Sequence, residues 1–212
     1  VGVFGIIASV RWYKKRSETR MIGCFLSQSF LWHYYSILKE GERDMKATVF
    51  HEHGGVERLI YADMEKPKIT PYEVLVKVKA CALNHLDIWV RQGLPGIEIP
   101  MPHISGSDIA GEIAEVGIEV KNFRPGDKVI IAPGVRCRKC VCCITNSDSM
   151  CNSFKIMGFQ VQGGYAEYAK AHVDNIIPVS HKLSFEEWAA IPLVFLTAWH
   201  MLITRGQLRP GE

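Results

Sequence analysis

Cysteine is concentrated in one short stretch of this chain, where residues 137–151 read CRKCVCCITNSDSMC and hold five of the seven cysteines. Cys137, Cys140, Cys143 and Cys151 have the spacing C-x2-C-x2-C-x7-C, so four thiolates can converge from one loop. Four thiolates close a tetrahedral zinc shell, with Zn–S distances of about 2.3 Å, and leave no position for water. The spacing therefore predicts a structural zinc site.

Two other interpretations of these cysteines stay open. Cys142 adjoins Cys143 and could replace it as a ligand. The cysteines could also form a disulfide or remain buried free thiols. However, the total of seven is odd, and Cys24 and Cys81 lie apart from the cluster, which suits a reducing compartment better than a disulfide framework. We therefore expect a cytoplasmic protein.

The first 44 residues differ in composition from the rest of the chain. They carry seven Lys and Arg against four Asp and Glu, so the net charge of +3 lies in them and residues 45–212 are neutral. A neutral body lacks the basic face that binds phosphate backbones, so we expect no nucleic-acid partner. The apolar segments of residues 1–44 are shorter than roughly 20 residues, and the first precedes the basic run, which disfavours a membrane helix and a secretory signal. Residues 1–44 are thus predicted to be a leader that forms no domain, either a genuine extension or a stretch upstream of a true start at Met45.

From Met45 onward the chain consists of short extended segments separated by Gly and Pro. Strands are predicted over residues 46–50, 59–62, 73–80, 109–116, 128–132 and 165–171, and helices over 85–92, 184–190 and 194–204. Within the third strand, Val74, Val76 and Val78 alternate with an outer set that includes Leu75, which is typical of a half-buried strand. Many strands followed by late helices predict an α+β fold on a barrel-like antiparallel core.

Seven segments after Met45 occur in an informative order. They are MKATVF at 45–50, VLVKVKACALNHLDIWVRQG at 74–93, GSDIAGEIAEVG at 106–117, FRPGDKV at 123–129, the four-cysteine stretch, GGYAEYA at 163–169 and AAIPLVFLTAWHML at 189–202. Together they resemble the medium-chain dehydrogenase/reductase superfamily, in its zinc-containing alcohol dehydrogenase and quinone reductase branch. The resemblance implies a GroES-like catalytic domain over 45–190, with the four cysteines holding structural zinc in a lobe. It also implies that 191–212 begin the connection to a Rossmann domain missing from a C-terminally truncated chain.

In the zinc-catalysing members of this superfamily, three side chains bind an active-site metal. By motif order these ligands fall on Asn84, on Ser107, and on or beside Leu193. An amide, a hydroxyl and an alkyl chain lack the soft or basic donors that a catalytic zinc needs, so we expect no catalytic zinc. Asp87 and Asp108 keep acidic positions of the family. A different metal set stays open, with ligands drawn from Cys81, His85, Asp87, His103 and Asp108.

The missing metal ligands change the expected reaction. Hydride addition to an isolated ketone builds an oxyanion that a metal ion stabilises strongly. An enone or a quinone delocalises this charge, so hydrogen-bond donors suffice. The resemblance has the same implication, because Asn84 and Asp87 match the Asn–Asp pair of zinc-independent quinone and enoyl reductases, and Thr197 matches a position beside the nicotinamide. We therefore expect Asn84 and Asp87 to be catalytic and Thr197 to contact NAD(P)H in the full-length protein.

Two other functions stay open: a zinc-dependent alcohol dehydrogenase with non-standard ligands, and a non-enzymatic zinc-binding module. Asn84 could also simply cap the helix that follows it. A zinc ribbon places two separated C-x2-C pairs, whereas the cysteines here are contiguous, so an oxidoreductase is favoured. No G-x-G-x-x-G motif occurs, so we expect this chain alone to be inactive. The expected partner is a flat, apolar small-molecule substrate, with no membrane partner, and the resemblance allows a homo-oligomer of the full-length protein.

Overall fold

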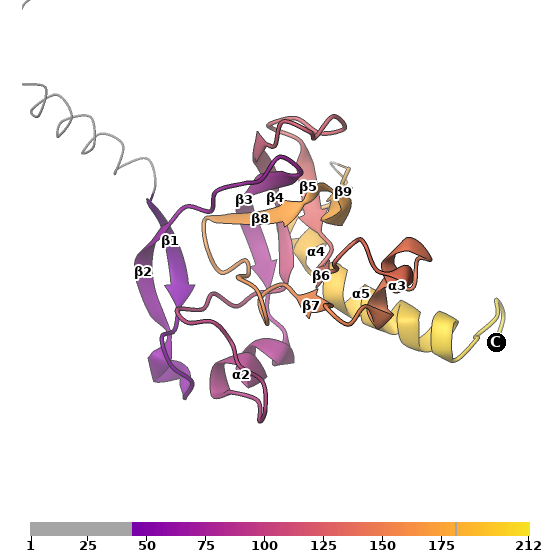
Figure 1. Ribbon diagram of the computed structural model, residues 1–212, viewed down its shortest axis with the longest axis horizontal. Coiled ribbons are helices and arrows are strands. Elements are labelled where there is room, and N and C mark those ends of the chain that lie inside the picture. Colours follow the sequence, from indigo (N-terminus) through magenta and orange to yellow (C-terminus); the bar gives the residue numbers. More distant parts are fainter. Residues whose placement is uncertain (1–43, 181) are drawn as a thin grey trace, which may run out of the picture. The chain divides into compact units, whose positions relative to one another are not determined.

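The computed structural model describes residues 44–180 and 182–212, so the predicted leader, apart from Asp44, lies outside the described residues. The described chain begins with an antiparallel hairpin of β1 (Asp44–Val49) and β2 (Ile60–Glu65), in which Ala47 lies opposite Ala62 (Figure 1). Alternate residues of β1 are buried, and Met45, Ala47 and Val49 pack with Ile104. This is the period-two pattern of a strand with one face on a core.

The main sheet has five antiparallel strands in the order β8-β3-β4-β5-β9. Their bounds are β3 (Glu73–Ala82), β4 (Asp108–Val116), β5 (Lys128–Ile131), β8 (Tyr168–His172) and β9 (Ile176–Pro178). The β1–β2 hairpin continues this sheet beyond β8, because the Thr48 N–H donates to the Tyr165 carbonyl at 2.7 Å and Ala47 forms a bridge with Ala166. The sheet thus curls around an aliphatic core, as predicted for a barrel-like domain.

The burial of β3 departs from the predicted alternation. Val74 and Val76 are buried as expected, but Leu75, which was predicted to face outward, is only 1% exposed. A bulge between the pairs Leu75–Glu115 and Val76–Ile113 interrupts the two-residue period at this point. Since a bulge re-aims the side chains beside it, the alternation cannot be continued through it.

The short elements were not predicted. They are η1 (Val56–Arg58), β6 (Gly134–Val135), α3 (Val141–Ile144), η2 (Asp148–Met150), β7 (Lys155–Ile156), η3 (Val173–Asn175) and β9. The pair β6–β7 joins residues about 20 positions apart, with Gly134 opposite Ile156. A two-residue strand carries no periodic signal, so only its pairing reveals it. Of these elements, β6 and β7 pair immediately before and after the four-cysteine stretch.

The helices follow the sequence signals. α2 (His85–Gln92) has the predicted bounds, and α4 (Phe185–Ala189) begins after Ser184, whose Oγ accepts the Glu187 N–H at 3.2 Å. α5 (Pro192–Trp199) continues into the π-helical η4 (His200–Arg205), so the predicted helix over 194–204 begins two residues earlier and ends one later.

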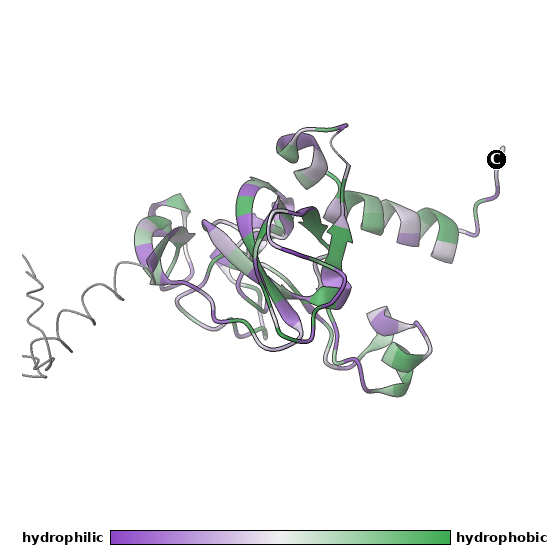
Figure 2. Ribbon diagram, turned by 90° about the horizontal axis from the view of Figure 1, so that it is seen from above, coloured by the Kyte–Doolittle hydropathy of each residue, from purple (hydrophilic) through white to green (hydrophobic). Residues whose placement is uncertain are grey.

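The C-terminal helical segment extends away from the sheet (Figures 1 and 2). Phe195 is 63% exposed and Trp199 is 65% exposed. By length and composition alone, Phe185–Arg205 is also long and apolar enough to cross a membrane, with a mean hydropathy of 1.3 and 11% of that window buried. A helix that is apolar all round is normally enclosed by other structure. The expected absence of a membrane partner stays a prediction.

Gly111 lies at the centre of the sheet, between Val78 of β3 and Val129 of β5. A Cβ here would stand 2.2 Å from the Lys77 carbonyl oxygen. We expect Gly111→Ala to lower the free energy of unfolding by about 3 kcal/mol, measured by urea denaturation, because the strands must move apart. Gly126→Ala is the control: its φ is +93° and no atom lies within 4 Å of its added Cβ, so it should cost only about 1 kcal/mol. Equal losses would contradict the steric account.

His103 joins the loop before β4 to the end of β1. Its side chain is 1% exposed, its Nε2 lies 3.1 Å from the Gly158 carbonyl oxygen, and burial lowers its pKa. A depressed pKa in the folded state means that the unfolded state binds the proton more readily, so stability falls as the pH drops below about 6.5. We expect the urea midpoint of the zinc-saturated protein to fall between pH 7.5 and 6, and to fall less in His103→Gln. An identical slope in both proteins would show that His103 carries none of this dependence.

Candidate functional site

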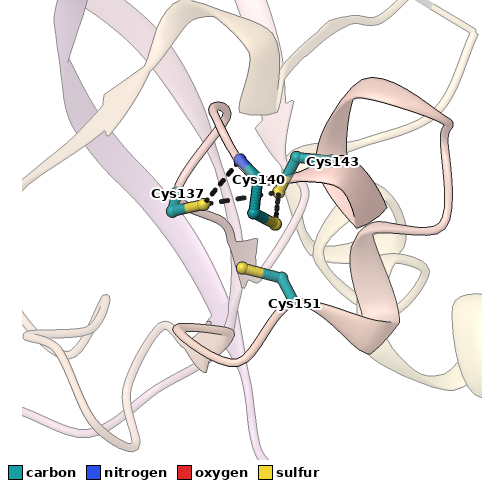
Figure 3. A group of neighbouring side chains, drawn as sticks. All are labelled: Cys137, Cys140, Cys143 and Cys151. Carbon is teal, nitrogen blue, oxygen red and sulfur yellow. Dashed lines mark hydrogen bonds between the residues drawn. The ribbon is translucent and has the colours of Figure 1, made fainter.

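The four predicted metal ligands lie together in the lobe (Figure 3). Their sulfur atoms are all within 4.8 Å of one another; Cys143 Sγ lies 3.8 Å from Cys137 Sγ and 3.5 Å from Cys140 Sγ. Sulfur atoms at the corners of a tetrahedron with Zn–S distances of about 2.3 Å lie about 3.8 Å apart. The residues present therefore fit a closed structural zinc site. Cys142 is not a member of this group.

Two backbone N–H groups stabilise the thiolate form of Cys137. The N–H groups of Lys139 and Cys140 point at Cys137 Sγ and lower its pKa to about 6. Burial raises the pKa of Cys143, because removal from water disfavours the charged thiolate, and a fully deprotonated cluster therefore needs a cation beside it. Four thiolates in one place thus favour a bound cation, and Zn²⁺ suits a tetrahedral set of four sulfur donors.

The lobe is tied to the sheet by a buried amide. Asn175 donates from Nδ2 to the carbonyls of Ala132 and Gly134, at 2.8 and 2.6 Å. Its Oδ1 accepts from Arg138 at 2.8 Å, and Arg138 lies between Cys137 and Cys140 in the sequence with a φ of +64°. No local pattern indicates this role of Asn175, because its partners lie about 40 residues away along the chain.

A second polar cluster joins three segments that are distant in sequence. Asn84 follows β3, Asp108 is the first residue of β4, and Leu193 lies in the first turn of α5. Asn84 Nδ2 donates to Asp108 Oδ2 at 2.8 Å, and the Leu193 N–H donates to Asp108 Oδ1 at 2.6 Å. Asp108 is 1% exposed, and burial raises its pKa despite these two donors. The three elements are therefore locked through one buried carboxyl group.

Asp87 lies beneath this cluster. It is 9% exposed, and three donors surround it: the Asn84 N–H at 2.8 Å, the Gly106 N–H at 3.1 Å and the Tyr165 hydroxyl at 2.6 Å. Burial and the neighbouring Asp87 raise the pKa of Tyr165, so Tyr165 stays a donor. With these contacts, Asp87 holds the start of α2 and the loop before β4 in place. A direct catalytic role for Asp87 stays a prediction.

The other side chains considered as ligands of a catalytic metal make hydrogen bonds or ring contacts elsewhere. Ser107 Oγ donates to the Met157 carbonyl at 2.7 Å. His103 is held by Gly158, and the His85 ring packs edge-on against Trp89 with centroids 4.8 Å apart. Among residues 44–180 and 182–212, the four cysteines of the lobe are the only group of three or more His, Cys, Asp or Glu ligands that converges. The alternative set around Cys81 and His85 is therefore not brought together.

Thr197 is exposed on α5, four residues after Leu193. Residues four apart lie on the same face of a helix, so the hydroxyl of Thr197 is one turn from the N–H bound to Asp108. Tyr165 and Asn175 are the polar residues that the sequence analysis missed. The GGYAEYA segment containing Tyr165 was noted, but nothing in it indicated that its hydroxyl reaches a carboxylate 78 residues away.

Comparison with known proteins gives consistent matches. Residues 70–181 match the alcohol dehydrogenase GroES-like domain. The chain is 36% identical over 170 residues to an alcohol dehydrogenase of Geobacillus stearothermophilus, covering 79% of this chain and 49% of that protein. It is 32% identical over 173 residues to a quinone oxidoreductase of Mus musculus, covering 81% of this chain and 44% of that protein. A crystal structure of an NAD-dependent alcohol dehydrogenase has a TM-score of 0.77 and 45% identity, covering 79% of this chain and 49% of that one. The chain thus spans about half the length of the curated relatives it matches.

Zinc content tests the metal centre directly. We expect one zinc per chain by elemental analysis, because the lobe offers one closed set of four thiolates. Cys143→Ser should lose this zinc, since a hydroxyl is a poor ligand for it.

Cys142→Ser is the matched control for this measurement. It changes the adjacent cysteine, which lies outside the group, and should keep the zinc. Loss of zinc from Cys142→Ser but not from Cys143→Ser would assign the ligand to the other residue.

Proposed function

Since the chain belongs to the medium-chain dehydrogenase/reductase family, with residues 70–181 in its alcohol dehydrogenase GroES-like domain, we propose that it is the substrate-binding half of a nicotinamide-dependent reductase. The reaction is hydride transfer to an enone or a quinone, without a catalytic metal. In this proposal the whole protein carries the activity, and we expect no turnover by the present chain alone because it has no G-x-G-x-x-G motif.

This proposal depends on one observation, the hydrogen bond that holds the side-chain amide of Asn84 against Asp108. One N–H bond of this amide is directed at Asp108, and Asn84 is only partly buried, so in this proposal the second N–H donates to a ligand. Ser107 donates to a backbone carbonyl, and Leu193 offers no ligand atom in its side chain. The three positions therefore supply a hydrogen-bond donor rather than a set of metal ligands, which supports a substrate that needs only a donor.

The hydride, the electron pair and the proton each have a source and a destination in the proposed reaction. The reduced nicotinamide, when bound, supplies a hydride. In an enone the hydride adds to the carbon remote from the carbonyl, and the electron pair of the C=C bond moves toward the carbonyl oxygen. The second N–H of Asn84 donates to that oxygen as the charge develops, and the resulting enolate takes a proton from water. A donor placed in advance lowers the barrier because no solvent must reorganise.

The remaining residues have supporting roles in this proposal. Asp87 is a positioning residue, since its three donors fix the backbone of Asn84. Thr197 contacts the nicotinamide from the exposed face of α5. The apolar side chains of Trp89 and Phe195, both exposed, favour a flat apolar substrate over a polar one. The four cysteines hold structural zinc and take no part in the reaction.

The proposed partners and location follow from the same residues. The substrate is a small molecule, and no nucleic acid or membrane takes part. The six cysteines in the described part of the chain are free, which supports a reducing compartment such as the cytoplasm. The exposed apolar side chains of α5 support a further packing partner for this helix, and we propose NAD(P)H as cofactor and a homo-oligomer for the whole protein.

The proposal predicts a substrate preference in the whole protein. With NADH and NADPH each supplied, we expect 2-cyclohexenone and 1,4-benzoquinone to be reduced at a kcat/KM at least 100-fold above that for cyclohexanone. Asn84→Ala should lower kcat/KM for the enone by about 100- to 1,000-fold, because one donor to the oxyanion is lost.

Asn152→Ala, at an exposed asparagine of the lobe, is the matched control and should leave kcat/KM unchanged. Two results would favour the alternative, a zinc-dependent alcohol dehydrogenase: a second zinc per chain, or efficient reduction of cyclohexanone. Binding of neither nucleotide would favour the non-enzymatic module.

A further inference from the structure

Asp108 is buried in an unusual electrostatic setting. It is 1% exposed, and no ion pair among residues 44–180 and 182–212 involves it. Its two hydrogen-bond donors, the Asn84 amide and the Leu193 N–H, are both neutral. A carboxyl group without a cationic partner is expensive to bury, so a neutral side chain would be favoured at this position if stability alone decided.

A neutral asparagine side chain could not accept both of the hydrogen bonds that Asp108 accepts. Both oxygens of Asp108 act as acceptors, one toward the helix α5 and one toward Asn84. An asparagine side chain at this position has only one acceptor oxygen. If that oxygen kept the Leu193 N–H, its own amide hydrogens would face Asn84, whose amide would have to turn over and present its oxygen in the place of its nitrogen.

The orientation of the Asn84 amide decides whether it presents an N–H donor or its oxygen to a bound molecule. With the NH₂ group turned toward Asp108, the second N–H projects from a nitrogen whose position is fixed. With the amide turned over, the cluster loses this fixed donor. The Asn84 side chain also faces the Asp87 N–H in a capping box at the start of α2, and the Asp108 carboxyl group acts with this contact to turn the NH₂ group toward the cluster.

Resting on the proposed function, we propose that Asp108 is a positioning residue that sets the amide orientation of Asn84 and fixes Asn84 relative to helix α5. One of its oxygens binds the Asn84 amide, and the other binds the Leu193 N–H of helix α5. Asp108 does not touch the substrate, because both oxygens are occupied and its side chain is buried. Its effect on the reaction passes through Asn84.

Nuclear magnetic resonance of the ¹⁵N-labelled 212-residue chain tests this assignment without any need for activity. In the parent chain, we expect slow exchange of the Leu193 backbone amide and separated shifts for the two Asn84 side-chain protons, one of which is bound to a carboxylate. These parent signals remain measurable even where a variant fails to fold. Two equivalent, rapidly exchanging Asn84 side-chain protons in the parent would overturn the proposal.

The variant Asp108→Asn should move the Asn84 side-chain signals, because the amide turns over. Glu112→Gln is the matched control, since Glu112 lies on the same strand and pairs with Lys79 at 3.1 Å outside the cluster. It should leave those signals in place. Unchanged Asn84 signals in Asp108→Asn would overturn the proposal.

A double-mutant cycle in the whole protein tests whether the effect passes through Asn84. We expect Asp108→Asn to lower kcat for the enone by about 10- to 100-fold, mainly through the lost donor. In an Asn84→Ala background, the same change should lower kcat by less than about twofold, because the two residues act as one unit. If Asp108 had a merely structural role, Asp108→Asn would lower kcat by the same factor in the parent and in the Asn84→Ala background. That result would overturn the proposal. If the parent reduces no enone or quinone, the proposed function fails, while the resonance comparison still decides the role of Asp108.

Discussion

The antiparallel register between β3 and β4 is the constraint on which the candidate site depends. It places Ala82 opposite Asp108, so that Asn84, two residues past Ala82, lies within 2.8 Å of the Asp108 carboxyl group. A slip of one residue would turn Asp108 to the other face of the sheet and separate the pair. Gly111 allows the two strands to approach in this register, because the Lys77 carbonyl occupies the space that a Cβ at position 111 would need.

The same register brings a network of buried polar groups together. Asp108 reaches α5 through the Leu193 N–H, and Asp87 gathers the Tyr165 hydroxyl and the Gly106 N–H. Every carboxyl oxygen in this network has a donor. A buried network with all of its members satisfied is rigid, and it can hold a side-chain amide in one orientation. Such rigidity suits a site that stabilises charge with fixed dipoles rather than with a metal ion.

The four-cysteine lobe has a different physical basis. Its ligands come from one stretch of 15 residues, and its short helical turns bring the sulfur atoms together locally. Contact with the sheet passes through Asn175, which binds the carbonyls on either side of Pro133 and the side chain of Arg138. The lobe is therefore a self-contained candidate metal site, and its ligands come from a different part of the chain than the Asn84 cluster.

The sequence by itself determined the features that depend on local pattern: the strands of the main sheet apart from β9, the bounds of α2, the curled antiparallel core and the spacing of the four cysteines. Each arises from residues close together in the chain, where periodicity, caps and ligand spacing act directly. The tertiary structure alone decided the burial of Leu75, the pairing of β6 with β7, and the partners of Asp87, Asp108 and Asn175. These depend on a bulge, or on contacts between residues about 20 to 85 positions apart. No local pattern encodes such contacts, because a hydrogen bond between distant segments forms only after the sheet register has brought them together.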